Sequence, residues 1–298
     1  MAGILLPKQN FMKTILIATD FSNGSRVAAL WGVQFAKALD AKIILFNAYK
    51  VAHAVPSFNV GISRYDIMMQ TDKKLMDEAD FLDTKRSLIE IICDEGEPED
   101  AIINIANEKK IDFIIAGMKG SGKSFKNIFG STAVSLTRKT NVPLILIPEN
   151  AGYRNPETIV FASDLGVGGD LHAIDELTDI FRFFKSKLYV VTVLKNKNKE
   201  WFEVLNTPQT LRKAFEATDT TFEYPVDIDI TNALNSFIEK NKAEMLIMMP
   251  HRHEWFERIF KKSETKDMIF HSYVPLLILP EKLLEKNNTI HNKKAVEI

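Results

Sequence analysis

Four of the 13 glycines in this 298-residue sequence fall in one short segment, residues 111–140. They are Gly117, Gly120, Gly122 and Gly130, and the last is followed directly by Ser131 and Thr132. A strand that ends in glycines and leads into a helix beginning Gly-Ser-Thr can bring bare backbone N–H groups against phosphate oxygens, and the positive end of the helix adds to the attraction. The segment predicts a phosphate-binding loop, with an ordinary surface loop as the structural alternative.

The same loop also matches a second phosphate-binding pattern. Residues 117–124 read GMKGSGKS, which satisfies the GxxxxGK[ST] pattern of a Walker A loop. In that interpretation Lys123 would reach the β- and γ-phosphates, Ser124 would bind Mg²⁺, and the protein would hydrolyse ATP. A Walker A loop is accompanied by an aspartate elsewhere in the chain, and Asp164 could serve as that residue. However, Asp164 is better explained by an internal repeat of the sequence, in which it corresponds to Asp20.

Strands and helices alternate around these residues. Residues 15–18 form a short apolar run, as expected of a strand covered on both faces. Ser22 or Asn23 then offers an N-cap, and apolar residues follow at helical spacing up to Ala38. The pattern continues with strands at 42–47, 87–93, 113–116 and 142–148 and helices at 98–107 and 131–138. Alternation of this kind predicts an α/β fold with a parallel sheet.

The two halves of the chain repeat this order. TILIATDFS at 14–22 corresponds to TIVFASDLG at 158–166, and VPLILIPE at 142–149 corresponds to VPLLILPE at 274–281. We interpret this as a tandem duplication of a doubly wound α/β domain, with its ligand crevice at the carboxyl ends of the strands. The expected domains are 1–150 and 151–284, joined through the polar segment 149–157, and residues 285–298 form a C-terminal tail.

Composition narrows the function classes. The chain has 38 Lys and Arg against 39 Asp and Glu, so no bulk charge favours nucleic acid or an anionic membrane as a partner. A single cysteine, Cys93, excludes an internal disulfide, and we expect it to be a buried thiol. The longest apolar runs are about one strand long, and the N-terminus lacks the apolar region of a secretory signal. We therefore expect a cytoplasmic protein.

With these features, the sequence resembles the universal stress protein family in its tandem, two-domain form. Nucleotide-binding members carry Gly, two residues, Gly, nine residues, then Gly and Ser or Thr, which here are Gly117, Gly120, Gly130, Ser131 and Thr132. An Asp closing the first strand in ATDFS, EGEP at 95–98 and VPLILIP at 142–148 agree with this resemblance. It covers nearly the whole chain and implies two Rossmann-like domains of the adenine nucleotide alpha hydrolase-like type.

The resemblance also implies where ATP would lie. Ala18, Thr19 and Asp20 would line the adenosine pocket, with Asp20 on ribose or a divalent ion such as Mg²⁺, and Ala48 would touch adenine. Ribose and phosphates would contact Gly117, Met118, Gly120, Gly130, Ser131 and Thr132. From the residues alone, Asp20 has a second interpretation as a strand-end carboxylate that caps the next helix.

The second half lacks this glycine pattern. Residues 243–267 contain no glycine, and Lys261 and Lys262 stand where Gly130 and Ser131 stand in the first half. We expect no ATP binding of the family type there. His251 and His253 give only two ligands in sequence and make a weak case for a metal.

We thus predict an ATP-binding regulatory module in which nucleotide orders the 117–130 loop and alters a surface read by a protein partner or a second copy. The final strands of the halves are expected to pair within one chain, and a homodimer is left open. The alternatives are a slow ATPase or autophosphorylating protein and a nucleotide-free interaction scaffold. The role of residues 51–86 is left open, and the alternatives are a lid over the nucleotide, an interaction surface and a simple surface insertion.

Overall fold

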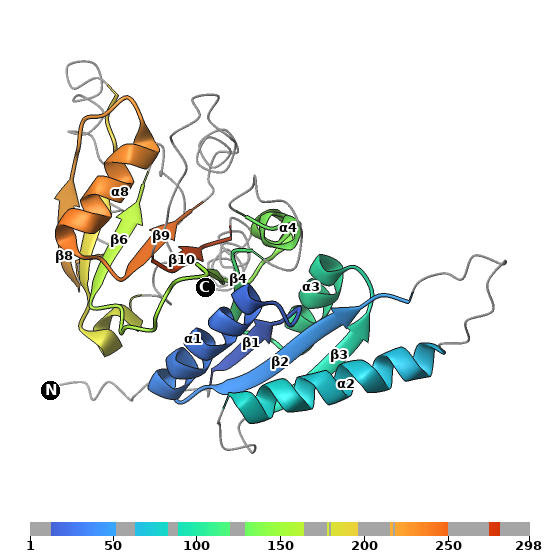
Figure 1. Cartoon of the computed structure of the whole chain (residues 1–298). Helices are drawn as coiled ribbons and strands as arrows, with labels where there is room; N and C mark the ends of the chain where they lie inside the picture. Colours follow the sequence, from blue (N-terminus) through green and yellow to red (C-terminus); the bar gives the residue numbers. More distant parts are fainter. Residues whose placement is uncertain are drawn as a thin grey trace, which may run out of the picture.

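The computed structural model describes residues 13–51, 63–82, 89–119, 129–163, 178, 180–195, 215–216, 218–249 and 274–280 (Figure 1). The first half contains β1 (Thr14–Ala18), α1 (Asn23–Leu39), β2 (Lys42–Tyr49), α2 (Arg64–Phe81), β3 (Ile89–Glu95), α3 (Pro98–Glu108), β4 (Phe113–Gly117), α4 (Ser131–Lys139) and β5 (Leu144–Ile147). The second contains β6 (Thr158–Ala162), β7 (Lys187–Val191), β8 (Asp219–Glu223), α8 (Ile230–Asn241), β9 (Met245–Met248) and β10 (Leu276–Ile278).

All of these strands belong to one ten-stranded sheet, in the order β3-β2-β1-β4-β5-β10-β9-β6-β7-β8. Each half contributes the same doubly wound order of its own five strands, and every pair within a half is parallel. This is the α/β fold that the alternation of strands and helices predicts.

The two halves join where β5 and β10 pair antiparallel, with Ile145 opposite Leu277. The expectation that the final strands pair within one chain is confirmed. Pairing these apolar strands with each other covers two edges that would otherwise expose backbone groups. The segment between the halves is also fixed to the first half, since the ring of Tyr153 lies edge-on to Trp31 of α1 at 5.3 Å between centroids.

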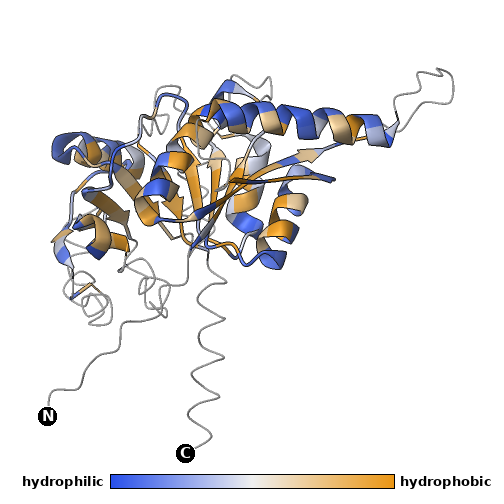
Figure 2. Cartoon of the chain, turned by 90° about the horizontal axis from the view of Figure 1, so that it is seen from below, coloured by the Kyte–Doolittle hydropathy of each residue, from blue (hydrophilic) through white to orange (hydrophobic). Residues whose placement is uncertain are grey.

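Strand residues alternate between two cores, one on each face of the sheet. Ile15 and Ile17 of β1 point into the core that α1 and α2 cover, whereas Leu16 points into the core that α3, α4 and α8 cover. Both faces are apolar because helices cover both, which is why the strands read as continuous apolar runs. Figure 2 shows these apolar strands enclosed by helices with hydrophilic outer faces.

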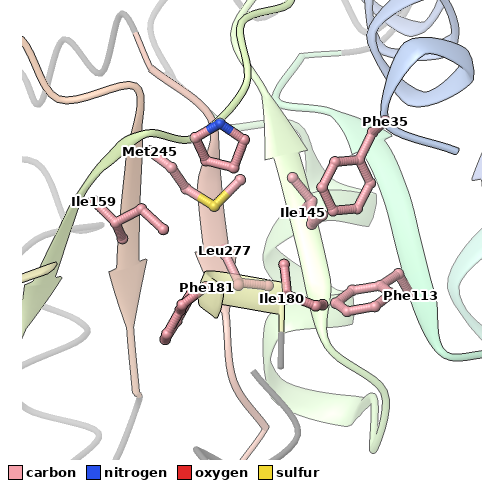
Figure 3. Close-up of a pocket in the computed structure, with 9 residues that line it drawn as sticks. Phe35, Phe113, Ile145, Ile159, Ile180, Phe181, Met245 and Leu277 are labelled. Carbon is pink, nitrogen blue, oxygen red and sulfur yellow. The ribbon is translucent and has the colours of Figure 1, made fainter. Parts of the chain in front are cut away.

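A small apolar cavity of about 10 Å³ lies at the junction of the halves. Figure 3 shows Ile145 and Leu277 at its centre, with Phe35 and Phe113 on one side and Met245 on the other. The space is about the size of one water probe, so this junction is a packed core and not a ligand site.

The same polar contact begins both halves. The backbone N–H of Thr14 donates to Asp112 Oδ2 at 2.6 Å, and that of Thr158 donates to Glu244 Oε2 at 2.7 Å. In each case a carboxylate just before the fourth strand of the half fixes the start of the first strand. Among the described residues, no helix has the length and apolarity needed to cross a membrane.

Candidate functional site

A cleft of about 910 Å³ opens at the carboxyl ends of β1, β2 and β4. This volume lies in the range of about 300–1,000 Å³ typical of small-molecule sites, and the position is where doubly wound sheets bind ligands. Its walls are the ends of these strands, the first turn of α3 and one side of α4. The lining residues include Ala18, Thr19, Asp20, Phe46, Asn47, Ala48, Pro98, Ile102, Gly117, Lys119, Phe129, Gly130, Ser131, Thr132, Ser135, Arg138 and Lys139.

The predicted site residues gather in this cleft, with two exceptions. Eight of them line it: Ala18, Thr19, Asp20, Ala48, Gly117, Gly130, Ser131 and Thr132. Met118 does not, because it is only 4% exposed and packs into the core that α3 and α4 cover. Its carbonyl oxygen accepts from the N–H of Gly130 at 2.7 Å, so Met118 joins the end of β4 to the start of α4. Gly120 lies outside the described residues, as do Lys123 and Ser124 of the Walker A match.

A hydrogen-bonded corner after β1 shapes one wall of the cleft. The backbone N–H of Thr19 donates to the carbonyl oxygen of Phe46 at 2.9 Å, and Asn47 Nδ2 donates to the carbonyl oxygen of Thr19 at 2.7 Å. These bonds tie the ends of β1 and β2 together. Asp20 follows, exposed at the cleft, and its Oδ1 accepts from the N–H of Ser22 at 3.1 Å.

Asp20 therefore supports the turn that leads to α1, but it does not cap that helix. The N-cap is Ser22, whose side chain accepts from the N–H of Ser25 at 3.2 Å. Of the two candidate caps, Ser22 and Asn23, the structure selects the first.

Among the described helices, α1, α3 and α4 begin near the cleft, and of these three α4 alone has a start that favours an anion. The first turn of α1 is satisfied by the side chain of Ser22. That of α3 carries Glu99 and Asp100, which repel negative charge. The N-cap of α4 is Gly130, with no side-chain cap hydrogen bond from a described residue and no acid in the first turn. The backbone N–H groups and the positive end of the helix dipole at the start of α4 would therefore favour an anion there.

Basic side chains add to the positive character of this side of the cleft. Lys119, Arg138 and Lys139 all line it. Lys139 Nζ donates to Asp100 Oδ1 at 3.0 Å, and this bond raises the pKa of Lys139. Ser135 Oγ donates to Glu99 Oε1 at 3.5 Å, so α3 and α4 are connected across the cleft wall.

The opposite side of the cleft is more apolar. Phe46 and Ala48 at the end of β2, together with Pro98 and Ile102 of α3, line this part. Small residues at positions 18 and 48 leave room there for a flat group. Asn47 is only 7% exposed and is held by Thr19.

Sequence reasoning missed several of these lining residues. No sequence motif marks Lys119, Arg138 or Lys139 as a site residue. The spacing offers a weak signal for the last two, which follow Ser131 by about two helical turns on α4. The apolar part formed by Phe46, Pro98 and Ile102 carries no chemical signal in the sequence, since these residue types are common in any core.

Two glycines allow the close backbone packing behind the cleft. An ideal Cβ at Gly117 would lie 2.9 Å from the carbonyl carbon and oxygen of Gly24, and one at Gly24 would lie 2.4 Å from the carbonyl oxygen of Lys119. Real Cβ atoms do not approach so closely, so the end of β4 meets the first turn of α1 only because both residues are glycine.

The second half differs at the equivalent strand end. Following the β9 strand, Met249 stands where the first half has Gly117 and is only 6% exposed, within the core. The later positions of the second half's loop, including His251, His253, Lys261 and Lys262, lie outside the described residues, and so does Asp164.

Cys93 lies on β3, away from the cleft. It is half-buried, not fully buried as expected, and its Sγ donates to Asp72 Oδ1 on α2 at 3.0 Å. Burial and this hydrogen bond raise the pKa of the Cys93 thiol to about 12.

Fold and cleft together define a Rossmann-like α/β protein with a large cleft at the carboxyl ends of its strands. Residues 12–148 match the model of the universal stress protein family, so the first half of the chain contains a domain of that family. Two Mycobacterium tuberculosis proteins are similar to slightly less than half of the chain. Universal stress protein Rv2624c is 26% identical over 137 residues, covering 46% of this chain and 48% of its own length. Universal stress protein Rv1636 is 25% identical over 146 residues, covering 45% of this chain and 95% of its own length.

The chain spans about half the length, 48%, of the first curated relatives it matches. Solved structures extend the likeness over both halves. A universal stress protein from Archaeoglobus fulgidus DSM 4304 superposes with a TM-score of 0.67 at 16% identity, covering 90% of this chain and 98% of that one. A functionally unknown protein from Pseudomonas aeruginosa PAO1 superposes with a TM-score of 0.56 at 14% identity, covering 95% of this chain and 98% of that one. Identities this low show a shared fold alone.

Proposed function

We propose that the universal stress protein domain of this chain binds ATP in the cleft and that the bound nucleotide makes the protein a regulatory module of a stress response. The observation that carries the proposal is the polarity of the cleft. Small and apolar residues line its β2 side, the uncapped N-terminus of α4 lies on its β4 side, and the carboxylate of Asp20 stands at the end of β1 between them.

Each part of ATP has matching chemistry in this arrangement. The base fits beside Ala18, Ala48 and Ile102, which offer apolar contact without bulk. A ribose hydroxyl can donate to the carboxylate of Asp20. The triphosphate belongs at the start of α4, where backbone N–H groups and the hydroxyls of Ser131 and Thr132 can donate, with Lys119 nearby as a cation.

A Mg²⁺ ion would be held mainly through the nucleotide. Among the described residues, no three acidic, histidine or cysteine side chains are grouped as a metal site. Protein-bound Mg²⁺ commonly uses one or two carboxylates together with substrate phosphates and water. Asp20 supplies one such carboxylate, so the site fits a Mg²⁺ ion that accompanies ATP.

Regulation follows from where the phosphates would bind. A bound triphosphate would bridge the end of β4 and the start of α4, and its gain or loss would change the neighbouring surface. We propose that a protein partner or a second copy of the chain reads this difference.

We also propose the division into a nucleotide-binding domain at 1–150, a second domain at 151–284 without that function, and a tail at 285–298. The end of the family match at residue 148 supports the boundary. Met249 at the position of Gly117 supports the loss of function in the second domain.

Calorimetric titration of the full chain with ATP, with and without Mg²⁺, tests the proposal. We expect one ATP bound per chain, and weaker binding when Asp20 is replaced by Ala. A wild-type chain that binds neither ATP nor any other nucleotide would rule the proposal out and leave an interaction scaffold.

A further inference from the structure

The corner between β1 and α1 connects the cleft to helix α2. Asp20 lines the cleft, whereas the next residue, Phe21, is half-buried against the core beneath α1 and α2. Adjacent residues thus face different partners, so the conformation of this corner determines where the Asp20 carboxylate lies.

Phe21 adopts an uncommon backbone conformation. Its φ is 63°, in the left-handed region that bulky residues rarely occupy. Such a conformation persists only where the surroundings hold it. Within the corner, the N–H of Phe21 donates to Thr19 Oγ1 at 3.0 Å.

The C-terminal half of α2 supplies further support. Lys74 Nζ lies 5.7 Å from the centroid of the Phe21 ring. Arg26, in the first turn of α1, donates from Nε and Nη2 to the two carboxylate oxygens of Glu78, at 3.0 and 2.6 Å. The guanidinium of Arg26 also lies 4.9 Å from the ring centroid of Phe81.

The ion pair between Arg26 and Glu78 differs from an ordinary surface pair. The Glu78 side chain is only 2% exposed, while that of Arg26 is 42% exposed. A carboxylate so deeply buried needs its cation, and a bidentate pair fixes the geometry of both partners. The pKa of Arg26 is raised by this hydrogen bond. The first turn of α1 is therefore fixed against α2 at one point.

We propose that Glu78 is a positioning residue for the nucleotide cleft. Through Arg26 it fixes the start of α1 against α2, and this holds Phe21 in its left-handed conformation. The held corner aims the Asp20 carboxylate into the cleft. The inference rests on the proposed function for its ligand, and it gives α2, within the segment 51–86 whose role the sequence left open, the role of a support for the site.

A double-mutant cycle tests whether Glu78 acts through Asp20. ATP affinity is measured by calorimetry for the wild type, Glu78→Gln, Asp20→Asn and the double variant. We expect Glu78→Gln alone to weaken binding about fivefold, a coupling within the range for residues in one network. The double variant should bind as Asp20→Asn does. If the two losses multiply instead, Glu78 acts by another route and the inference is wrong.

Two further variants separate positioning from general effects. Glu90→Gln removes the exposed ion pair with Lys109, which joins Oε1 and Nζ at 2.9 Å at the C-terminal end of α3, and should leave ATP affinity unchanged. Lys74→Gln changes an exposed side chain at the same corner and should also weaken ATP binding. This variant keeps the inference testable if Glu78→Gln does not fold.

Amide hydrogen exchange without nucleotide tests the inference independently of the proposed function. We expect Glu78→Gln to speed exchange at Phe21 and Ser22, whose N–H groups bond to Thr19 and Asp20. Exchange at Ile145 of β5 should not change. A wild type that binds no nucleotide would refute the proposed function only, whereas unchanged exchange at Phe21 and Ser22 would overturn the role of Glu78.

Discussion

Gly117 and Gly24 meet backbone to backbone behind the cleft, where an ideal Cβ on Gly117 would lie 2.9 Å from the carbonyl of Gly24. The end of β4 and the first turn of α1 can approach this closely only without side chains. Both elements also reach the cleft, since Gly117 of β4 and Ser25 of α1 line it. The glycines at the strand end thus have a packing role in addition to any contact with phosphate.

Replacing Gly117 by Ala should therefore lower stability as well as ligand affinity. The new methyl group must displace backbone atoms, and overpacking of this kind costs about 1–3 kcal/mol in free energy of unfolding. Urea denaturation of the full chain measures this change. Gly152→Ala is the matched control, because a Cβ there meets nothing within 4 Å. Equal stability of the two variants would show that the close contact is not required.

Asp20→Asn should separate the charge of this residue from its role in the turn. Asparagine keeps the Oδ1 atom that accepts from the N–H of Ser22, so the corner should remain folded. Loss of the negative charge should weaken ATP binding about tenfold, in line with the strength of hydrogen bonds to ionised groups. Calorimetric titration gives the affinity, and an unchanged value would mean that the Asp20 carboxylate does not contact the ligand.

Cys93 should be unreactive at neutral pH. Its pKa of about 12 lies above the ordinary value of 9.0, so the thiol stays protonated and the nucleophilic thiolate is scarce. The raised pKa stabilises the folded state below about pH 9, and this contribution is lost as the pH rises toward 12. Iodoacetamide labelling followed by mass spectrometry should show slow modification of the folded chain and rapid modification in urea. Rapid labelling of the folded chain at pH 7 would contradict this environment for Cys93.

The junction between the halves should be a major source of stability. Leu277 is 3% exposed and lies opposite Ile145 across the antiparallel β5–β10 pair. Leu277→Ala should cost about 2–5 kcal/mol in free energy of unfolding, because it enlarges a cavity in a packed core. Ile145→Ala should be non-additive with it, since the two side chains share this cavity. A loss below about 1 kcal/mol in urea denaturation would mean that the site collapses around the smaller side chain.

The sequence predicts local elements and repeated strands well, because burial on both faces leaves a strong apolar signal. The predicted pairing of the final strands is confirmed, and eight of the predicted site residues line one cleft. The sequence offered Ser22 or Asn23 as the N-cap of α1, and the structure has Ser22. The strand predicted at 87–93 instead runs from Ile89 to Glu95, since its last residues continue the ladder beside Tyr49. Because β3 lies at the edge of the sheet and its last residues are polar, the apolar pattern does not predict where this strand ends.

Other features depend on contacts between distant residues and could not be predicted from local pattern. The pair of Arg26 and Glu78 spans 52 positions. The left-handed conformation of Phe21 is set by its surroundings, and phenylalanine has no local preference for it. The buried position of Met118 follows from the direction of the chain after β4, where its carbonyl accepts from Gly130. ATP binding itself remains a prediction.

The most direct measurement of the central claim is to denature freshly purified full-length protein and identify any released nucleotide by mass. The matched control is Gly130→Lys, which copies the residue at the corresponding position of the second half. Gly130 has a φ of −67° and a ψ of 157°, a conformation that lysine adopts readily, so the control should fold. We predict about one ATP per wild-type chain and none in the control. Wild-type protein that releases no nucleotide, and takes none up when ATP and Mg²⁺ are added, would contradict the account.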